Sequence, residues 1–298
     1  MNKSTYLELP EVKDFVEWLS VTLNCDAPEP FSHSYDVEPR GRSNSKKKWR
    51  CNSIYNAFEQ YEWRFSYQDS DTGKKIKGST YYESEAALND LQKRLIVAVA
   101  SGDNDSCFNV CSMILKWGGV LGSERKGNKK ILLEMRENLA CYLAKARDYF
   151  NGDSELVSRY QVVLGSGKTN LVMNAGFTKI YSLLCNEFII YDGRVGAALG
   201  RLVVGFMQSQ SEKKYTEIPD GLDFYYGNAK NNKVNRNPSV GSYKFKALSA
   251  SSPVHIRNNL KANWIVGALS LENSNGFSKQ SAPSRAFEAA LFMIGYRV

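Results

Sequence analysis

Helical spacing of apolar residues runs through most of the chain and predicts a mainly α fold. Near the N-terminus, Val12, Phe15, Leu19 and Leu23 recur three or four positions apart, as on one face of an amphipathic helix. The same pattern predicts helices over 85–100, 105–117, 129–150, 154–163, 171–184, 192–208, 252–271 and 285–296, after a first helix within 1–24. The last of these is apolar nearly all round, so we expect it to be buried.

One segment alternates instead of following the helical period. Its aromatic positions are Tyr61, Trp63, Phe65 and Tyr67. Alternation of this kind is typical of a strand with one buried face. Residues 71–73, Asp-Thr-Gly, supply a turn before a second short run. The segment predicts a β-hairpin, the one strand pair that the pattern indicates clearly.

The change of character near residue 84 predicts two regions. Residues 1–83 hold the hairpin and the basic run 46–50, whereas residues 84–298 form a helical domain. A chain of 298 residues has room for one large domain with a smaller one appended. Apolar residues make up 43% of it, which suffices for a core and argues against wholesale disorder.

Charge favours a polyanionic partner. Lysine and arginine number 39 against 31 acidic residues, which gives a net charge of +8. Neutralising phosphates releases counterions and drives binding, although ordinary solubility is the alternative explanation. The loop 229–247 contains no acidic residue, and its cations are Lys230, Lys233, Arg236, Lys244 and Lys246. With aromatic residues in and beside it, this loop either tracks a phosphate backbone and stacks bases or is a solvated surface loop.

Several classes of site and location are not indicated. The six cysteines lack zinc-knuckle spacing, and the only histidines are His33 and His255. We therefore expect no metal, no cofactor and no Ser-His-Asp triad. The N-terminus lacks a secretory signal, and no apolar run approaches the roughly 20 residues of a membrane span. The expectation is a monomeric cytoplasmic protein in a reducing compartment, without a membrane partner.

The segment Leu164–Thr169 reads Leu-Gly-Ser-Gly-Lys-Thr and is similar to the end of a phosphate-binding loop. That loop needs a glycine, four residues, and then Gly-Lys-Ser or Gly-Lys-Thr. Val162 holds the position of the first glycine, so the same backbone cradle could not form. ATP or GTP hydrolysis is therefore the weakest of three functional hypotheses.

Two titratable residues lie on apolar helical stripes. Asp192 precedes Val195 by three positions and so lies at the inward N-terminal end of its stripe. An aspartate there is a good N-cap, and a cap also fixes the carboxylate for chemistry, so the two roles are compatible. Lys179 shares a stripe with Val172 and Leu183. It either extends its amine to solvent or is a desolvated amine of the kind that forms Schiff bases.

The surroundings of both residues resemble a known family. Gly176–Lys179, a connector and then Ile189–Val195, with its Tyr-Asp-Gly-Arg-Val, look like the heart of the helix–hairpin–helix DNA glycosylases. The likeness is greatest to the OGG-fold branch, named for 8-oxoguanine DNA glycosylase. Ile114–Gly119 and Ala289–Tyr296 are similar to stretches of its bacterial members. The resemblance covers about residues 84–298 and implies an OGG-like helical bundle.

The resemblance also implies a reaction, the excision of a modified base from double-stranded DNA. Asp192 would stabilise the positive charge that develops on the sugar. Lys179 would attack C1′ and form a Schiff base; otherwise the enzyme is monofunctional and leaves an abasic site. The segment before Lys179 lacks the family's Leu-Pro-Gly pattern, so both outcomes stay open. Some relatives remove heavily modified bases in anti-phage defence. No iron–sulfur cluster is implied, because no cysteine follows Cys185.

Base excision also needs a pocket and contacts with the DNA backbone. A flipped base requires an apolar pocket with a few polar groups. Trp117, Tyr191 and Trp264 are candidate walls, although large aromatic residues commonly belong to the core. Arg194 and Arg201, on the outward side of the Asp192 helix, either hold phosphates or face solvent. The leading hypothesis is a DNA glycosylase, and the alternative is a non-catalytic DNA-binding or sensor protein on the same fold.

Overall fold

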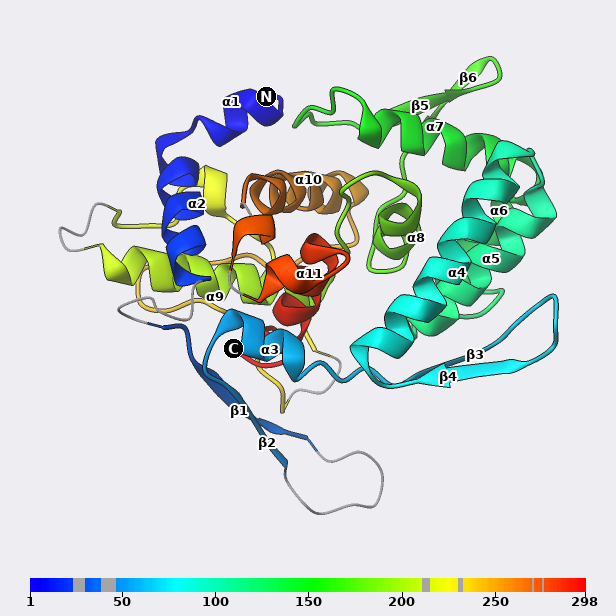
Figure 1. Ribbon diagram of the computed structural model, residues 1–298. Helices are drawn as coiled ribbons and strands as arrows, with labels where there is room; N and C mark the ends of the chain where they lie inside the picture. Colours follow the sequence, from blue (N-terminus) through cyan, green and yellow to red (C-terminus); the bar gives the residue numbers. More distant parts are fainter. Residues whose placement is uncertain (24–29, 39–46, 211–214, 230–232, 270, 275) are drawn as a thin grey trace. The chain divides into compact units, whose positions relative to one another are not determined.

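The structure is a computed structural model that describes residues 1–23, 30–38, 47–210, 215–229, 233–269, 271–274 and 276–298. Within these segments the fold is mainly helical, as the apolar periodicity predicts, and three two-stranded sheets accompany the helices. Figure 1 shows these elements in chain order. The chain divides into two compact units.

The two units interleave along the sequence. The first comprises residues 1–2, 62–190 and 250–257, and the second comprises 3–61, 191–249 and 258–298. The boundary predicted between residues 83 and 84 falls inside the first unit. Helix α10 (Ser252–Ala268) contributes residues to both units.

Four helices of the first unit pack against one another. They are α4 (Tyr81–Ala100), α5 (Asn104–Trp117), α7 (Leu139–Asn151) and α8 (Phe177–Leu184). Their fully buried positions include Leu91, Leu95, Cys111, Ile114, Leu143, Ala146 and Ile180. Each buried leucine or isoleucine stabilises the fold by about 1.5–3 kcal/mol relative to exposure, so this interior holds the unit together.

Helix α4 begins four residues before the predicted start because of its cap. The Thr80 hydroxyl accepts from the backbone N–H of Glu83, and the Glu83 carboxylate accepts from that of Thr80. This capping box satisfies two backbone donors that the helix itself leaves unpaired. Such a cap stabilises a helix start by about 1 kcal/mol.

The prediction of one helix over 129–150 is wrong. Helix α6 (Asn128–Glu134) ends early, and a 3-10 turn (Arg136–Asn138) redirects the chain before α7. The Asn104 side chain of α5 donates to the Glu137 carbonyl and accepts from the Ala140 N–H. A side chain distant in sequence thus starts α7, which apolar spacing alone does not reveal.

The predicted β-hairpin is present as β3 (Phe65–Gln68) paired with β4 (Lys75–Gly78). Its turn contains residues 71–73, with Gly73 at a φ of 68°. Tyr61 and Trp63 precede the strand rather than extending it.

The helix predicted over 154–163 is also wrong. A second hairpin, β5 (Gln161–Leu164) with β6 (Gly167–Asn170), lies there. β-Branched Val162 and Val163 favour a strand, and Gly165 takes a φ of 57° in the turn. Lys168 lies in β6 opposite Val163, so this glycine segment joins strand to strand. A phosphate-binding loop instead joins a strand to a helix, so the segment gives the nucleotide hypothesis no support.

Helix α9 (Gly193–Ser209) packs against α2 (Pro10–Thr22) and α11 (Pro283–Ile294) in the second unit. Helix α11, buried along most of its length as expected, also packs against α3 (Ile54–Glu59).

The single helix expected within 1–24 is instead two helices, α1 (Lys3–Leu7) and α2. Pro10 suits the first turn of a helix but disfavours helical backbone before it, so the chain breaks there. Further 3-10 turns cover Asp220–Leu222, Leu271–Asn273 and Phe277–Lys279.

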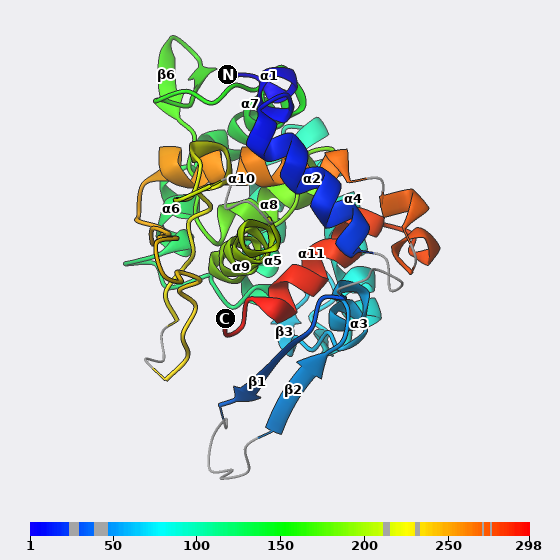
Figure 2. The ribbon, with the colours of Figure 1, turned by 90° about the vertical axis from the view of Figure 1, so that its left-hand side faces the viewer.

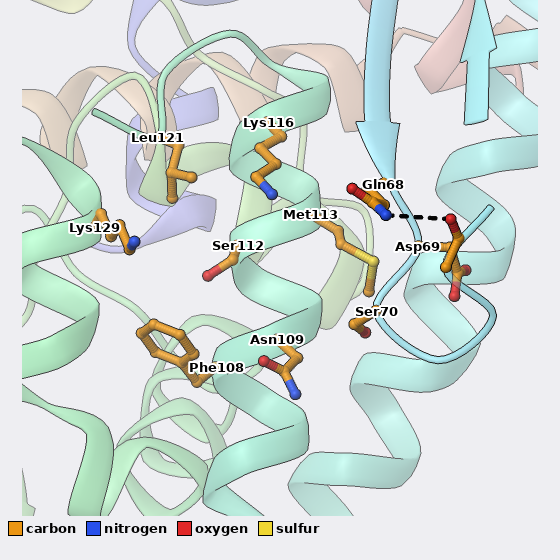
Figure 3. Close-up of a pocket in the computed structure, with 11 residues that line it drawn as sticks. Gln68, Asp69, Ser70, Phe108, Asn109, Ser112, Met113, Lys116, Leu121 and Lys129 are labelled. Atoms are coloured by element: carbon orange, nitrogen blue, oxygen red, sulfur yellow. Dashed lines mark hydrogen bonds between the residues drawn. The ribbon is translucent and has the colours of Figure 1, made fainter. Parts of the chain in front are cut away.

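The basic run of the N-terminal region lies partly in an unpredicted sheet. Strand β1 (His33–Val37) pairs antiparallel with β2 (Lys47–Cys51), and Figure 2 shows them as a paired ribbon. Tyr35 and Trp49 face each other across the strands and stack with ring centroids 4.6 Å apart. Both strands are short, and the nine residues between them exceed the usual hairpin loop of about two to five, so the sequence gives no local hairpin signal.

Candidate functional site

Asp192 is the N-cap of α9. Its Oδ1 accepts hydrogen bonds from the backbone N–H groups of Arg194 at 2.9 Å and Val195 at 3.3 Å. The side chain is half-buried. The predicted cap is therefore present, and it fixes a carboxylate at the positive end of the helix dipole.

Two arginines lie close enough to Asp192 to interact electrostatically. The Arg194 guanidinium lies over the rings of Phe292 and Tyr296, 4.1 Å and 4.9 Å from their centroids. Arg236 donates from Nε to the Tyr296 carbonyl at 3.3 Å. Burial lowers the pKa of Arg194 to about 10 and lowers that of Arg236, and the Asp192 charge opposes both shifts. Both arginines remain charged at neutral pH.

Arg201 lies two turns further along α9 and is half-buried. Its Nε is buried and has no hydrogen-bond partner among the residues that the structure describes. Burial lowers the pKa of Arg201. Burial and the nearby Arg201 charge lower the pKa of His33 to about 4, so His33 is neutral at pH 7. Its Nε2 lies 2.7 Å from the Arg297 carbonyl.

The second unit thus places neither Arg194 nor Arg201 on a fully solvated helix face. Arg194 is held by aromatic rings, and Arg201 has an unsatisfied buried donor. Unsatisfied buried donors are rare in native structures because they carry a desolvation cost. Arg194 and Arg236 therefore form a partly buried positive pair beside the Asp192 cap, whereas Arg201 lies two turns further along the helix.

The basic loop and the residues 225–227 that lead into it lie on α9, along three glycines. A Cβ on Gly193 would lie 2.6 Å from Gly227 Cα, and one on Gly196 would lie 2.1 Å from the Tyr225 carbonyl oxygen. On Gly200 it would lie 2.5 Å from Cγ of Pro238. Only glycine allows so close an approach of another segment to the helix. The loop is therefore seated on the helix that Asp192 begins.

Backbone hydrogen bonds fix this loop further. The Gly227 N–H donates to the Gly193 carbonyl at 3.1 Å, and the Tyr226 N–H donates to the Lys246 carbonyl at 3.1 Å. Lys246 Nζ lies 5.7 Å from the centroid of the Tyr225 ring. Lys233, Lys244 and Lys246 are exposed, Arg236 is half-buried, and Lys230 lies outside the described residues.

Lys179 lies in the first unit, within α8. The Asn174 Oδ1 accepts from the N–H groups of Gly176 and Phe177 at 2.7 Å and 3.1 Å and so starts this helix. The Lys179 side chain is 5% exposed, and its Nζ donates to the Ala175 carbonyl at 2.7 Å. Its stem packs on Gly118, where an added Cβ would lie 2.5 Å from Lys179 Cδ. The lysine does not extend to solvent.

Trp117 directly precedes the glycine on which Lys179 packs, so the first unit brings these two predicted site residues together. The Trp117 Nε1 is buried and has no hydrogen-bond partner within the described segments. Its carbonyl accepts from Trp63 Nε1 at 3.0 Å, and its ring lies 6.4 Å from that of Phe65. Lys179 thus packs on the residue that follows Trp117, while the Trp117 ring lies near Phe65.

Tyr191 and Trp264 belong to the interior of the second unit. Tyr191 is fully buried, and its hydroxyl donates to the Tyr225 carbonyl at 2.8 Å. Burial raises the pKa of Tyr191. Trp264 is 6% exposed and packs on Tyr6, with ring centroids 5.3 Å apart. Their packing is what the core interpretation of these aromatic residues predicts.

The predicted site residues therefore fall into two groups. Asp192, Arg194, Arg201, Arg236 and the loop lysines belong to the second unit, whereas Lys179 and Trp117 belong to the first. Sequence reasoning missed the glycines at 193, 196 and 200 and the aromatic supports of Arg194. These glycines could have been recognised from the sequence, because their spacings of three and four residues place them on one face of a helix.

Two general properties bear on the class of site. In the described part of the chain, no group of three or more His, Cys, Asp or Glu side chains could hold a metal ion. No helix in the same segments is long and apolar enough to cross a bilayer.

Comparison with protein-family models, with curated proteins and with solved structures finds no significant match to this chain. The family resemblance therefore rests on the motifs in the sequence, chiefly Gly176–Lys179 and Ile189–Val195.

Proposed function

We propose that the protein is a DNA glycosylase, which flips a modified base out of double-stranded DNA and hydrolyses its N-glycosidic bond. The observation that carries the proposal is the Asp192 carboxylate, fixed by two backbone N–H groups at the start of α9. The class of reaction is inferred from the resemblance of the motif around Asp192 to the DNA glycosylases. The OGG-like bundle, with its helix–hairpin–helix motif, belongs to the same proposal.

Asp192 has the properties that this reaction needs. Cleavage of the N-glycosidic bond develops positive charge on the sugar ring, and a fixed carboxylate near C1′ stabilises that charge. A side chain already held by hydrogen bonds costs little reorganisation when the reaction occurs. Arg194 and Arg236 lie near enough for their positive charges to interact with the Asp192 carboxylate.

The basic loop supports DNA binding beside this carboxylate. It packs on α9 at Gly200, and its lysines Lys233, Lys244 and Lys246 are exposed on the surface. Phosphate contacts position a protein on the duplex and make its affinity fall steeply with salt. Arg201, with its unsatisfied Nε, is a further candidate for a phosphate contact.

The surroundings of Lys179 favour the monofunctional form of the reaction. Its Nζ donates to the Ala175 carbonyl at 2.7 Å, and its stem is packed on Gly118. Attack on C1′ would require that hydrogen bond to break and the side chain to leave its packed position. We therefore assign base release to water activated by Asp192, with an abasic site as the product. Modified cytosines of phage DNA are one substrate class that the resemblance suggests.

The proposal is tested by incubating the protein with genomic DNAs that carry different modified bases and detecting released bases by mass spectrometry. Asp192→Asn is the informative variant, because asparagine caps helices as well as aspartate does but carries no charge. Asp103→Asn is the matched control, since Asp103 caps α5 through the Ser106 N–H at 2.9 Å. We expect base release from one class of DNA, lost in Asp192→Asn and retained in Asp103→Asn. Full activity in Asp192→Asn would reject the mechanism.

A non-catalytic DNA-binding or sensor protein is the second candidate. The packing of Lys179 and its hydrogen bond to the nearby Ala175 carbonyl favour this candidate, because neither requires chemistry. Such a protein would bind DNA with strong salt dependence and release no base from any DNA tested. Salt-dependent binding without product, across all substrates, would select this candidate over the glycosylase.

A further inference from the structure

A hollow of about 360 Å³ lies over the exposed face of α5, within the first unit. Its floor is built from residues of that helix, since Phe108, Ser112 and Lys116 recur every fourth position. The turn of the β3–β4 hairpin borders it on one side, and the segment that enters α6 borders it on the other. The volume lies at the small end of the range for ligand sites, about 300–1,000 Å³.

One group in the floor lacks a hydrogen-bond partner. Ser112 Oγ is buried and makes no hydrogen bond with any residue that the structure describes. Helical serines often bond to the carbonyl four residues earlier, which would have satisfied this hydroxyl. Because buried polar groups in native proteins are nearly always satisfied, this hydroxyl is suited to a hydrogen bond with a bound group.

The charge of the hollow is positive. Lys116 and Lys129 line it, and Lys129 Nζ pairs with the Glu124 carboxylate at 2.9 Å while remaining 31% exposed. The one carboxylate in the lining, Asp69, is neutralised by Arg94 at 2.7 Å and accepts backbone N–H groups of its own turn.

The β3–β4 hairpin extends this positive character. Gln68 lines the hollow and lies opposite Lys75 in the hairpin register, so both side chains share one face. Lys77 lies two residues on and belongs to the same face. These lysines attract anions toward the hollow.

The remaining lining suits a nucleoside better than a bare anion. The amides of Asn109 and Gln68 combine donors and acceptors, as base edges do, although the Gln68 amide also donates to the Gly73 carbonyl at 3.2 Å. Phe108 offers half-buried aromatic surface, and Met113 and Leu121 add apolar contact. An apolar lining with a few polar groups and cations is typical of a small-molecule site.

We propose that this hollow binds a nucleoside monophosphate group, with the phosphate on Lys116 and Lys129 and a hydroxyl or base edge on Ser112. A free mononucleotide and the 5′-phosphorylated end of a nucleic-acid strand both carry this chemistry. The site is separate from Asp192 and does not rest on the proposed glycosylase activity.

Binding is tested by calorimetric titration of the full chain with adenosine 5′-monophosphate, adenosine and inorganic phosphate, and with a 5′-phosphorylated single-stranded oligonucleotide. The proposal predicts that the mononucleotide binds at least about tenfold more tightly than adenosine or phosphate alone, because both halves are recognised. Binding of the oligonucleotide only through its 5′-phosphate would support the strand-end source. The proposal would be overturned if phosphate and the mononucleotide bound with equal affinity. It would also be overturned if neither the mononucleotide nor the oligonucleotide bound.

Adjacent lysines provide a matched pair of variants. Lys129 lines the hollow and pairs with Glu124, whereas Lys130 lies outside the lining and pairs with Glu134 at 3.5 Å. We expect Lys129→Gln to weaken mononucleotide binding by about tenfold, the loss of one charge-assisted contact, and Lys130→Gln to leave it unchanged. Equal effects of the two variants would reject the site, since they would report only the net charge.

Ser112→Ala separates ligand recognition from folding. Removing an unsatisfied buried hydroxyl does not lower the stability of the free protein, because no internal hydrogen bond is lost. The proposal predicts an unchanged or raised melting temperature together with about fivefold weaker mononucleotide binding. Unaltered affinity in this variant would remove Ser112 from the site and, with it, the observation on which the proposal is built.

Discussion

The starts of α8 and α9 invite comparison, since each carries one titratable residue on an apolar stripe. At α9 the carboxylate of Asp192 is half-buried and held by backbone N–H groups, with arginines beside it. In α8 the amine of Lys179 is 5% exposed and donates to the Ala175 carbonyl, which lies just before the helix begins. One group is fixed yet accessible, and the other is part of the packing.

The difference has a simple physical origin. An N-cap lies at the end of a helix, where unpaired N–H groups attract an acceptor and where the chain can still meet solvent. Lys179 is the third residue of α8, a helix in which all eight residues are buried. Similar sequence patterns thus produced a half-buried capping carboxylate in one helix and a packed amine in the other.

The largest expected effect tests how the segment that leads into the basic loop packs on α9. Gly196→Ala places a Cβ 2.1 Å from the Tyr225 carbonyl oxygen, a backbone atom that cannot rotate away. We expect the free energy of unfolding to fall by about 3 kcal/mol, the upper range for overpacking. Gly205→Ala is the control, since its Cβ would lie 3.4 Å from Trp18. It should stabilise α9 by up to about 1 kcal/mol. Denaturant titration measures the free energy of unfolding of both variants. Equal values would mean that Gly196 is not needed for this contact.

The next effect concerns Lys179. Lys179→Met keeps the length of the stem against Gly118 but leaves the Ala175 carbonyl without its Nζ donor. We expect a loss of stability of about 1–2 kcal/mol from that unsatisfied carbonyl. Base release should stay within about threefold of the wild type, as for a group that does not contact the transition state. Borohydride trapping of a covalent DNA complex in the wild type, absent from Lys179→Met, would instead make the lysine a nucleophile.

The Arg201 neighbourhood predicts a pH dependence. Burial and Arg201 lower the pKa of His33 from 6.5 to about 4, so the unfolded chain binds its proton more tightly than the folded one. Stability is therefore full above pH 6.5 and falls as the pH drops toward 4. The half-buried position reduces the effect to about 1–2 kcal/mol. Melting temperatures from pH 7 to 5 measure it, and His33→Gln should flatten the dependence. An unchanged slope in that variant would assign the dependence to other groups.

The smallest effect isolates the cap itself. Asp192→Ala removes the acceptor of two N–H groups and should lower stability by about 1 kcal/mol, whereas Asp192→Asn should leave it nearly unchanged. Thermal unfolding of the two variants separates capping from charge. A large loss in Asp192→Asn would show that the charge, and not the hydrogen bonds, holds this helix start.

Much of the helical framework could be predicted from the sequence, and the failures have identifiable causes. Apolar spacing located α4, α5, α9 and α11, and the position of Asp192 before Val195 predicted its cap. The β5–β6 hairpin was missed because Val162 and Val163 also fit a helical pattern over a short window. The break before α7 depends on Asn104, a side chain from another helix.

The candidate site was predictable only as separate residues. The motif pointed to Asp192, but the rings of Phe292 and Tyr296 around Arg194 come from the other end of the chain. The packing of the basic loop on α9 could not be predicted, because the sequence does not show which segment lies against the α9 glycines. The sequence did not point to Ser112, because whether a hydroxyl lacks a hydrogen-bond partner depends on its surroundings in the fold and not on its residue type.

The central claim, that the Asp192 carboxylate drives base release, is tested most directly by single-turnover kinetics. The substrate is the modified DNA from which the wild type releases a base, and Asp192→Asn is compared at equal folded concentration. The account predicts a fall in the rate of base release of about 100-fold or more, with DNA affinity largely retained. Equal rates for the wild type and Asp192→Asn would contradict it.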